Sequence, residues 1–170
     1  KNTQIENNIW LAFSPIKKNP LDIMIQKTTE LGVQKFIPIL SERTIVKEIN
    51  KERLKKIIIE ASEQSNRISI PKIESLKTLK IFLEEFPNNG SLIFCDVNSD
   101  KSNLKNILKK KNKGPTCVLV GPEGDFSEKE RQFIIEKKDI FSLSLANNIL
   151  RAETAAIASV TIVNYHLNLN

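Results

Sequence analysis

The chain has 170 residues, and its 26 basic and 20 acidic side chains leave a formal net charge of +6. No apolar run approaches the roughly 18 residues that a membrane span needs, so we expect no transmembrane segment. One histidine and two distant cysteines argue against a metal site, a zinc cluster or a disulfide framework. No secretory signal or transit segment opens the chain, which predicts a cytoplasmic protein.

Short apolar stretches alternate with longer segments of helical spacing. In chain order we predict strand 9–13, helix 19–31, strand 35–40, helix 50–67, helix 75–86, strand 91–97, helix 102–111, strand 116–120, a helix that begins at Ser127, strand 140–145 and helix 151–166. This alternation predicts an α/β fold with a mostly parallel sheet flanked by helices. No linker of distinct composition divides the chain, so residues 1–170 are expected to form one domain.

Local signals support individual boundaries. Pro20 suits the first turn of a helix and Gly32 its end. Ser127 and Glu130 have the spacing of a capping box. Cys95 and Cys117 lie in predicted buried strands, where we interpret them as small core hydrophobes rather than reactive thiols.

Two loops at the carboxyl ends of predicted strands are the candidate ligand sites, because ligands of open α/β sheets bind at that edge. The first is 121–126, which begins Gly-Pro-Glu-Gly and reads as a turn with proline second and glycine fourth. It lacks the Gly-Lys-Ser/Thr of a phosphate loop. The second is 145–150, which leads into Arg151 and Glu153. An arginine at a helix N-terminus opposes the macrodipole, which favours an anionic partner.

Five segments that follow one another along the chain are more specific together than any is alone. They are 22–33, 41–43, 60–67, 121–124 and 149–156. In this order they resemble the bacterial 16S ribosomal RNA uridine-N3 methyltransferases, the ribosomal small subunit methyltransferase E family of the SPOUT superfamily. The likeness runs from about residue 10 to residue 165.

The resemblance implies that the C-terminal segment threads a loop to form a trefoil knot, and that the knot loops bind S-adenosylmethionine. It also implies that the knot helices pair two subunits as a homodimer. Carried over by position, the cofactor-binding residues are Phe94, Cys95, Asp96, Gly121, Glu123, Gly124, Leu145, Ala146, Ile149, Leu150 and Arg151. The family usually has an N-terminal RNA-binding domain of the PUA type, and no segment here matches it.

The implied reaction is methylation of uridine N3 in 16S rRNA of the small ribosomal subunit. Arg151 is the candidate for stabilising negative charge on the uracil, and Glu153 or Glu123 is the candidate base. Arg43, Arg67 and Lys27 are the candidate RNA contacts.

Two positions depart from the family pattern: Ala146 stands where glycine is usual, and Asn148 where arginine is usual. Besides an unrelated mononucleotide-binding α/β domain, which nucleotide affinity without a knot would indicate, two alternatives stay open. The first is a SPOUT methyltransferase that acts on transfer RNA or on another ribosomal base. The second is a non-catalytic RNA-binding module of the same fold, which the extra methyl of Ala146 favours. Cofactor binding separates the second alternative from an enzyme.

Overall fold

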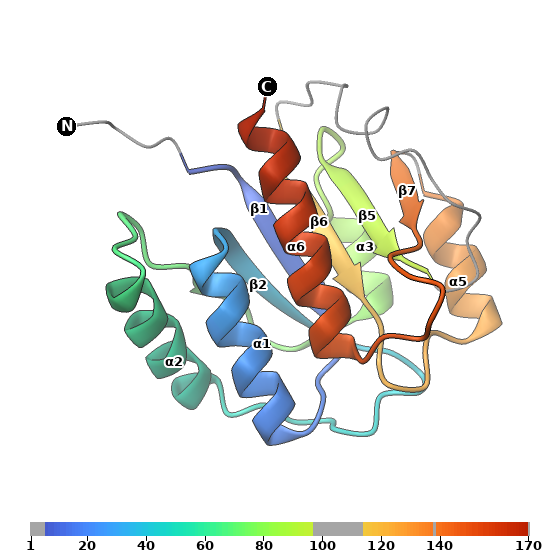
Figure 1. Ribbon diagram of the computed structural model, residues 1–170. Helices are drawn as coiled ribbons and strands as arrows, with labels where there is room; N and C mark the ends of the chain where they lie inside the picture. Colours follow the sequence, from blue (N-terminus) through green and yellow to red (C-terminus); the bar gives the residue numbers. More distant parts are fainter. Residues whose placement is uncertain (1–5, 97–113, 138, 170) are drawn as a thin grey trace.

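The computed structural model describes residues 6–96, 114–137 and 139–169, and Figure 1 shows their arrangement. The elements are β1 (Ile9–Phe13), α1 (Lys18–Glu30), β2 (Val33–Leu40), α2 (Lys51–Gln64), β3 (Lys72–Ile73), β4 (Lys77–Thr78), α3 (Leu79–Glu85), β5 (Ser91–Cys95), β6 (Thr116–Val120), α5 (Glu128–Ile135), β7 (Ile140–Leu143) and α6 (Ala152–Asn168). The predicted helix 102–111 lies outside the described residues.

All strand pairs in the described part of the chain are parallel. Their order is β3-β2-β1-β6-β5-β7. Strand β4 pairs with the last residues of β2, on the same side as β3, which pairs with earlier ones. The predicted parallel sheet is therefore confirmed. Because parallel strands end at the same edge, the segments that follow β1, β2, β5, β6 and β7 all emerge at one end of the sheet.

Helices cover both faces of the sheet, so the molecule has three layers. Figure 1 shows α1, α2 and α6 in front of the strands and α3 and α5 behind them. The side chains of β6 alternate between the two layers. Val118 and Val120 belong to the core with α1, α2 and α6, whereas Cys117 and Leu119 belong to the core with α3 and α5. The strand is buried on both sides, which explains why its sequence is apolar throughout.

The structure corrects several predicted boundaries. The helix expected over 75–86 is shorter, because Thr78 rather than Ser75 caps it by accepting a hydrogen bond from the amide of Ile81. The residues just before it belong to β4, which was not predicted. Strands β3 and β4 have two residues each, too few to show any alternation.

The predicted knot stays a prediction, because the connection between β5 and β6 runs through residues outside the described part of the chain. Among the described residues, no helix has the length and apolar character to cross a membrane.

Candidate active site

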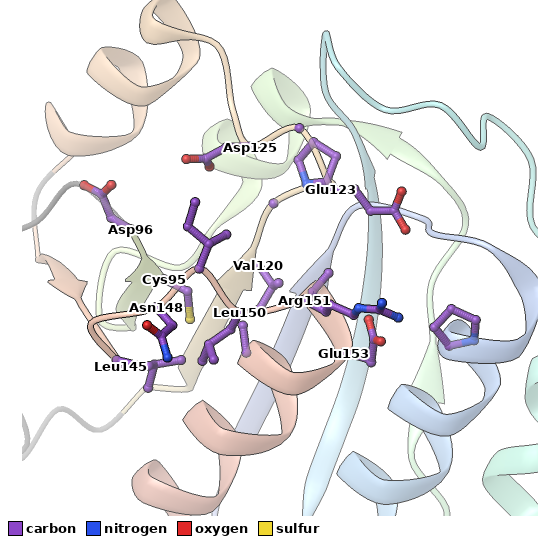
Figure 2. Close-up of a pocket in the computed structure, with 18 of the residues that line it drawn as sticks. Cys95, Asp96, Val120, Glu123, Asp125, Leu145, Asn148, Leu150, Arg151 and Glu153 are labelled. Carbon is purple, nitrogen blue, oxygen red and sulfur yellow. The ribbon is translucent and has the colours of Figure 1, made fainter.

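A pocket of about 700 Å³ opens at the carboxyl ends of β5, β6 and β7 (Figure 2). Three stretches of chain form most of its wall. They are Cys95 and Asp96 at the end of β5, residues 120–125 after β6, and residues 143–153 after β7. We call residues 121–126 the β6 loop and residues 144–150 the β7 loop. The two loops that the sequence singled out, which α5 and β7 separate along the chain, therefore share one pocket.

The β6 loop is a tight turn whose position differs by one residue from the prediction. The carbonyl of Pro122 accepts a hydrogen bond from the amide of Asp125 at 2.9 Å, so the turn covers 122–125 rather than 121–124. Asp125 has a φ of 60°, and its carboxylate accepts a hydrogen bond from the amide of Phe126 at 2.8 Å. Aspartate tolerates this left-handed backbone because its short side chain bonds locally.

Phe126 anchors the end of the β6 loop in the core. It is 4% exposed and packs against Phe94, with ring centroids 5.6 Å apart. A Cβ on Gly121 would meet the Phe126 ring at 3.0 Å, so glycine lets the loop leave β6 directly over that ring. Phe94 points into this core, away from the pocket wall. The expectation that Phe94 binds the cofactor does not fit this placement, because strand alternation sends its ring to the α3 side.

The predicted capping box is confirmed at the start of α5. The hydroxyl of Ser127 accepts a hydrogen bond from the amide of Glu130 at 3.2 Å, and the Glu130 carboxylate accepts one from the amide of Ser127 at 3.0 Å. The other Glu130 oxygen accepts a hydrogen bond from the amide of Glu42 at 2.8 Å. One carboxylate therefore caps α5 and fastens it to the segment after β2.

The inner wall of the pocket is formed by Cys95 and Asp96. Burial raises the pKa of the Cys95 thiol to about 11, partly offset by its 2.9 Å contact with the Ser159 hydroxyl, so the thiol is protonated at neutral pH. Asp96 is fully buried, and one of its carboxylate oxygens accepts hydrogen bonds from Nε and Nη2 of Arg131 at 3.0 and 2.8 Å. The hydrogen bonds to Asp96 also raise the pKa of Arg131. This ion pair ties the end of β5 to α5.

Three of the charged side chains that line the pocket, beside Lys17 and Asp125, are Arg151, Glu123 and Glu153. Arg151 is the N-cap residue of α6, and its side chain makes no capping hydrogen bond. Figure 2 shows all three side chains on the same side of the pocket. Within the described ranges, none of them forms a hydrogen bond or ion pair through its side chain, and none is among the residues with further contacts. These groups are available to a ligand.

Lys17 and Pro20 also line the pocket, and sequence reasoning missed them as site residues. Both follow β1, whose carboxyl end lies beside that of β6. The sequence does carry a signal for them, because β1 ends at the same edge of the sheet as β6.

Two of the three predicted RNA contacts lie on different parts of the surface. The side chain of Arg43 reaches the β6 loop, where Nη1 donates a hydrogen bond to the carbonyl of Gly124 at 2.9 Å. Lys27 lies ten residues along α1 from Lys17, about 15 Å along the helix axis. It forms an exposed ion pair with Glu30 at 3.0 Å and does not line the pocket.

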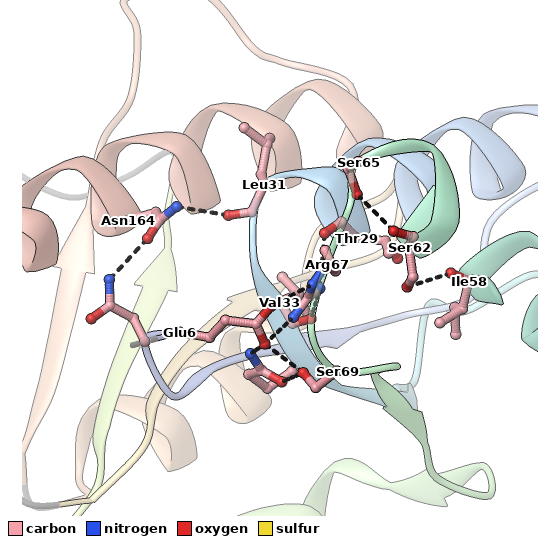
Figure 3. A network of polar contacts seen from close by, with 12 residues as sticks. Glu6, Thr29, Leu31, Val33, Ile58, Ser62, Ser65, Arg67, Ser69 and Asn164 are labelled. Atoms are coloured by element: carbon pink, nitrogen blue, oxygen red, sulfur yellow. Dashed lines mark hydrogen bonds and ion pairs between the residues drawn. The ribbon is translucent and has the colours of Figure 1, made fainter. Parts of the chain in front are cut away.

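Arg67, the third predicted RNA contact, is 5% exposed and binds its own chain (Figure 3). Its Nη1 donates to the carbonyls of Thr29 and Val33 at 2.9 and 2.6 Å, and its Nη2 contacts the Glu6 carboxylate at 3.2 Å. Burial opposes ionisation of Glu6, but hydrogen bonds from Arg67, Ser69 and Gln34 outweigh it and lower the pKa to about 2. An RNA contact therefore does not fit Arg67, because its donors are used at the end of the sheet where β2 begins.

No group of three or more histidine, cysteine, aspartate or glutamate side chains placed to hold a metal ion occurs in the described part of the chain.

The sequence matches known proteins over nearly its whole length. A family model described as an RNA methyltransferase domain matches residues 3–164. The ribosomal RNA small subunit methyltransferase E of Rickettsia conorii is 34% identical over 94% of this chain, which spans 65% of that protein's length. The protein of the same name from Mesomycoplasma hyopneumoniae is 32% identical over 94% of this chain, which spans 70% of its length.

Solved structures show the same fold. A ribosomal RNA small subunit methyltransferase E from Neisseria gonorrhoeae, bound to S-adenosyl methionine, superposes with a TM-score of 0.87 at 30% identity over 97% of this chain and 69% of its own. A SpoU methyltransferase from Streptomyces viridochromogenes, at 14% identity and a TM-score of 0.58, shows the fold alone. These neighbours confirm the predicted SPOUT fold class. The chain therefore belongs to the RNA methyltransferase domain family and, within it, to the ribosomal RNA small subunit methyltransferases E.

Proposed function

We propose that this chain is an S-adenosylmethionine-dependent methyltransferase that acts on N3 of a uridine in 16S rRNA of the small ribosomal subunit, in the cytoplasm. The observation that carries the proposal is the single pocket formed by the β6 and β7 loops, with an unpaired Arg151 at its mouth. The solved relative from Neisseria gonorrhoeae, 30% identical, has S-adenosyl methionine bound.

The donor groups of the pocket fit S-adenosylmethionine. Val120, Leu143 and Leu150 give an apolar surface for the adenosine part. In the described part of the chain, the peptide groups of the β7 loop make no hydrogen bonds, so they are free to bind the polar atoms of adenine and ribose. When bound, S-adenosylmethionine supplies a methyl group on a positively charged sulfur. The wall holds no lysine or arginine other than Lys17 and Arg151, as suits a ligand without phosphates.

Arg151 is proposed to stabilise the negative charge that develops on the uracil oxygens when N3 loses its proton. Its guanidinium is exposed at the pocket mouth and carries five donors that no carboxylate of the described chain occupies. A fixed cation aimed at developing charge typically contributes about 10² to 10³ in rate.

Glu123 and Glu153 are the two candidates for accepting the N3 proton, and both line the pocket. Glu153 lies in the first turn of α6. Glu123 lies at the apex of the β6 loop. Separate Glu→Gln variants at each position assign the base, because only loss of the base shifts the pH–rate profile.

The chain is proposed to act as a homodimer through α6. Two large hydrophobic side chains support this arrangement: Ile149, 86% exposed just before α6, and Tyr165, 63% exposed near its end. Sedimentation equilibrium tests it, and a monomer at micromolar concentration would contradict it.

The direct test of the function is calorimetry of the chain with S-adenosylhomocysteine, the demethylated product, followed by methyl transfer to small ribosomal subunits. We expect binding, and we expect the methylated base to map to a uridine N3. A folded chain that binds RNA but no S-adenosylhomocysteine would be a non-catalytic module. Methylation of a transfer RNA instead would support the other SPOUT alternative.

The role of Arg151 is tested with Arg151→Ala. We expect the rate of methyl transfer to fall by about 10² to 10³, with the midpoint of unfolding unchanged because the side chain is exposed. Arg53→Ala is the matched control, because Arg53 pairs with Asp22 between α2 and α1 and does not line the pocket. Full activity of Arg151→Ala would overturn the assignment.

A further inference from the structure

The apex of the β6 loop is held from outside by the segment that follows β2. Nη1 of Arg43 donates a hydrogen bond to the carbonyl of Gly124 at 2.9 Å and contacts the carbonyl of Phe126 at 3.5 Å. In the described part of the chain, these are the only hydrogen bonds that reach residues 122–126 from beyond the loop and its own strand and helix. The loop is therefore held in place by the buried Phe126 on one side. On the other side it is held by Arg43, which lies 81 residues from Gly124 in the sequence.

The aliphatic part of Arg43 also supports the loop. A Cβ placed on Gly124 would lie 3.7 Å from Cβ and 3.8 Å from Cδ of Arg43. Gly124 therefore lies directly over the arginine side chain, close enough that its peptide meets the guanidinium. This contact fixes the position of the loop apex. The apex carries Glu123, which lines the pocket.

Residues 41–44, which we call the β2 turn, are themselves firmly held. The amide of Thr44 donates to the carbonyl of Ser41 at 3.1 Å, and the amide of Ser41 donates to the hydroxyl of Thr44 at 2.9 Å. Thr44 is 3% exposed. The amide of Glu42 is bound to the Glu130 carboxylate that caps α5. The β2 turn thus contacts the β6 loop at its apex and just beyond its end.

We propose that Arg43 is a positioning residue that holds the β6 loop in the shape that binds S-adenosylmethionine, rather than a contact to RNA phosphates. The proposal rests on the proposed function of the pocket. An exposed arginine that follows a strand is typical of an RNA contact. Here, however, its guanidinium is directed at two carbonyls of the loop. Loss of these hydrogen bonds removes the external restraint from the apex while leaving Phe126 in the core.

The test is calorimetry of Arg43→Ala with S-adenosylhomocysteine in the absence of RNA. We expect the dissociation constant to rise by about tenfold, the factor that corresponds to one net hydrogen bond. In steady-state assays we expect KM for S-adenosylmethionine to rise, while kcat at saturation and KM for RNA stay within about twofold. A purely structural role would not produce that split.

Arg53→Ala is again the control, because it removes an arginine and an ion pair away from both loops. The unfolding midpoint of Arg43→Ala shows whether the variant is folded. Wild-type affinity for S-adenosylhomocysteine in Arg43→Ala, together with weaker RNA binding and a smaller salt dependence, would overturn the proposal and make Arg43 an RNA contact. Failure of the wild-type chain to bind S-adenosylhomocysteine would instead refute the proposed function.

Discussion

The two loops that enclose the pocket are built in opposite ways. The β6 loop contains an internal turn, ends in the buried Phe126, receives two hydrogen bonds from Arg43 and leads into a capping box. In the β7 loop, by contrast, residues 146–149 are exposed, and the described part of the chain provides no hydrogen bond to any of residues 144–150. One wall of the pocket is therefore held by the rest of the fold, whereas the other has few restraints, and we expect ligand binding to restrain it further.

Removing the anchor of the β6 loop is expected to have the largest effect. Phe126→Ala leaves a cavity beside Phe94 and should lower the free energy of unfolding by about 3–5 kcal/mol. Urea denaturation measures this difference. Asn147→Ala in the β7 loop is the matched control, and we expect it to stay within about 0.5 kcal/mol because the side chain is exposed and does not line the pocket. Equal losses in the two variants would show that the loops do not differ as described.

Protonation of Glu6, which pairs with Arg67 at the opposite end of the sheet, should lower the stability of the fold without affecting either loop. The pKa of Glu6 in the folded protein, about 2, lies below its ordinary value of 4.5, so ionised Glu6 stabilises the fold above pH 4.5. That contribution, up to about 3 kcal/mol, is lost as the pH falls from 4.5 towards 2. Urea titrations of the wild type and of Glu6→Gln should converge over this range. An unchanged difference between them at pH 2.5 and pH 6 would contradict the assignment.

The accuracy with which the sequence predicts a loop depends on whether the contacts of that loop are local or distant in sequence. Gly121, Pro122 and the Ser127–Glu130 pair are local signals, and they located the β6 loop to within one residue. The one-residue shift lies at Asp125, which closes the turn with a positive φ and precedes the buried Phe126. No local pattern shows that Gly124 is the partner of Arg43, because that contact exists only once β2 and β6 are placed in one sheet.

The same limit explains why the side chains of two predicted site residues, Phe94 and Arg67, are directed into the fold. Phe94 and Cys95 are neighbours on one strand, and the sequence does not say which of them faces the pocket. An arginine such as Arg67 is a residue type that often binds RNA. Its acceptors here are the backbone carbonyls of Thr29 and Val33, which no side-chain motif reveals. The fold class, by contrast, follows from the alternation of strands and helices, which is a property of the whole chain.

Ligand binding should change the β7 loop more than the β6 loop. Without ligand, we expect the amides of 146–150 to exchange with deuterium at close to the intrinsic rate, and those of Asp125 and Phe126, which have acceptors, to exchange more slowly. At an S-adenosylhomocysteine concentration of about 100 times Kd, protection in the β7 loop should rise by up to about 100-fold. Equal gains in the two loops would mean that neither wall is formed in advance.

The smallest expected effects come from two variants that each add or remove one methyl group. Gly121→Ala places a Cβ 3.0 Å from the Phe126 ring, which is packed and has little room to move, so we expect a loss of about 1–3 kcal/mol in stability. Ala146→Gly removes a methyl from an exposed position and should cost only about 0.4–1 kcal/mol, through the entropy of the unfolded chain. Thermal and urea unfolding of both variants give these differences.

The two variants should also differ in ligand affinity. Gly121→Ala displaces the start of a loop whose shape the pocket depends on, so calorimetry should show weaker binding of S-adenosylhomocysteine. Ala146→Gly changes a loop that no hydrogen bond from the described residues restrains, and its affinity should equal or exceed that of the wild type. A large loss of affinity in Ala146→Gly would mean that the methyl of Ala146 is itself part of a preformed wall, and the contrast between the two loops would not hold.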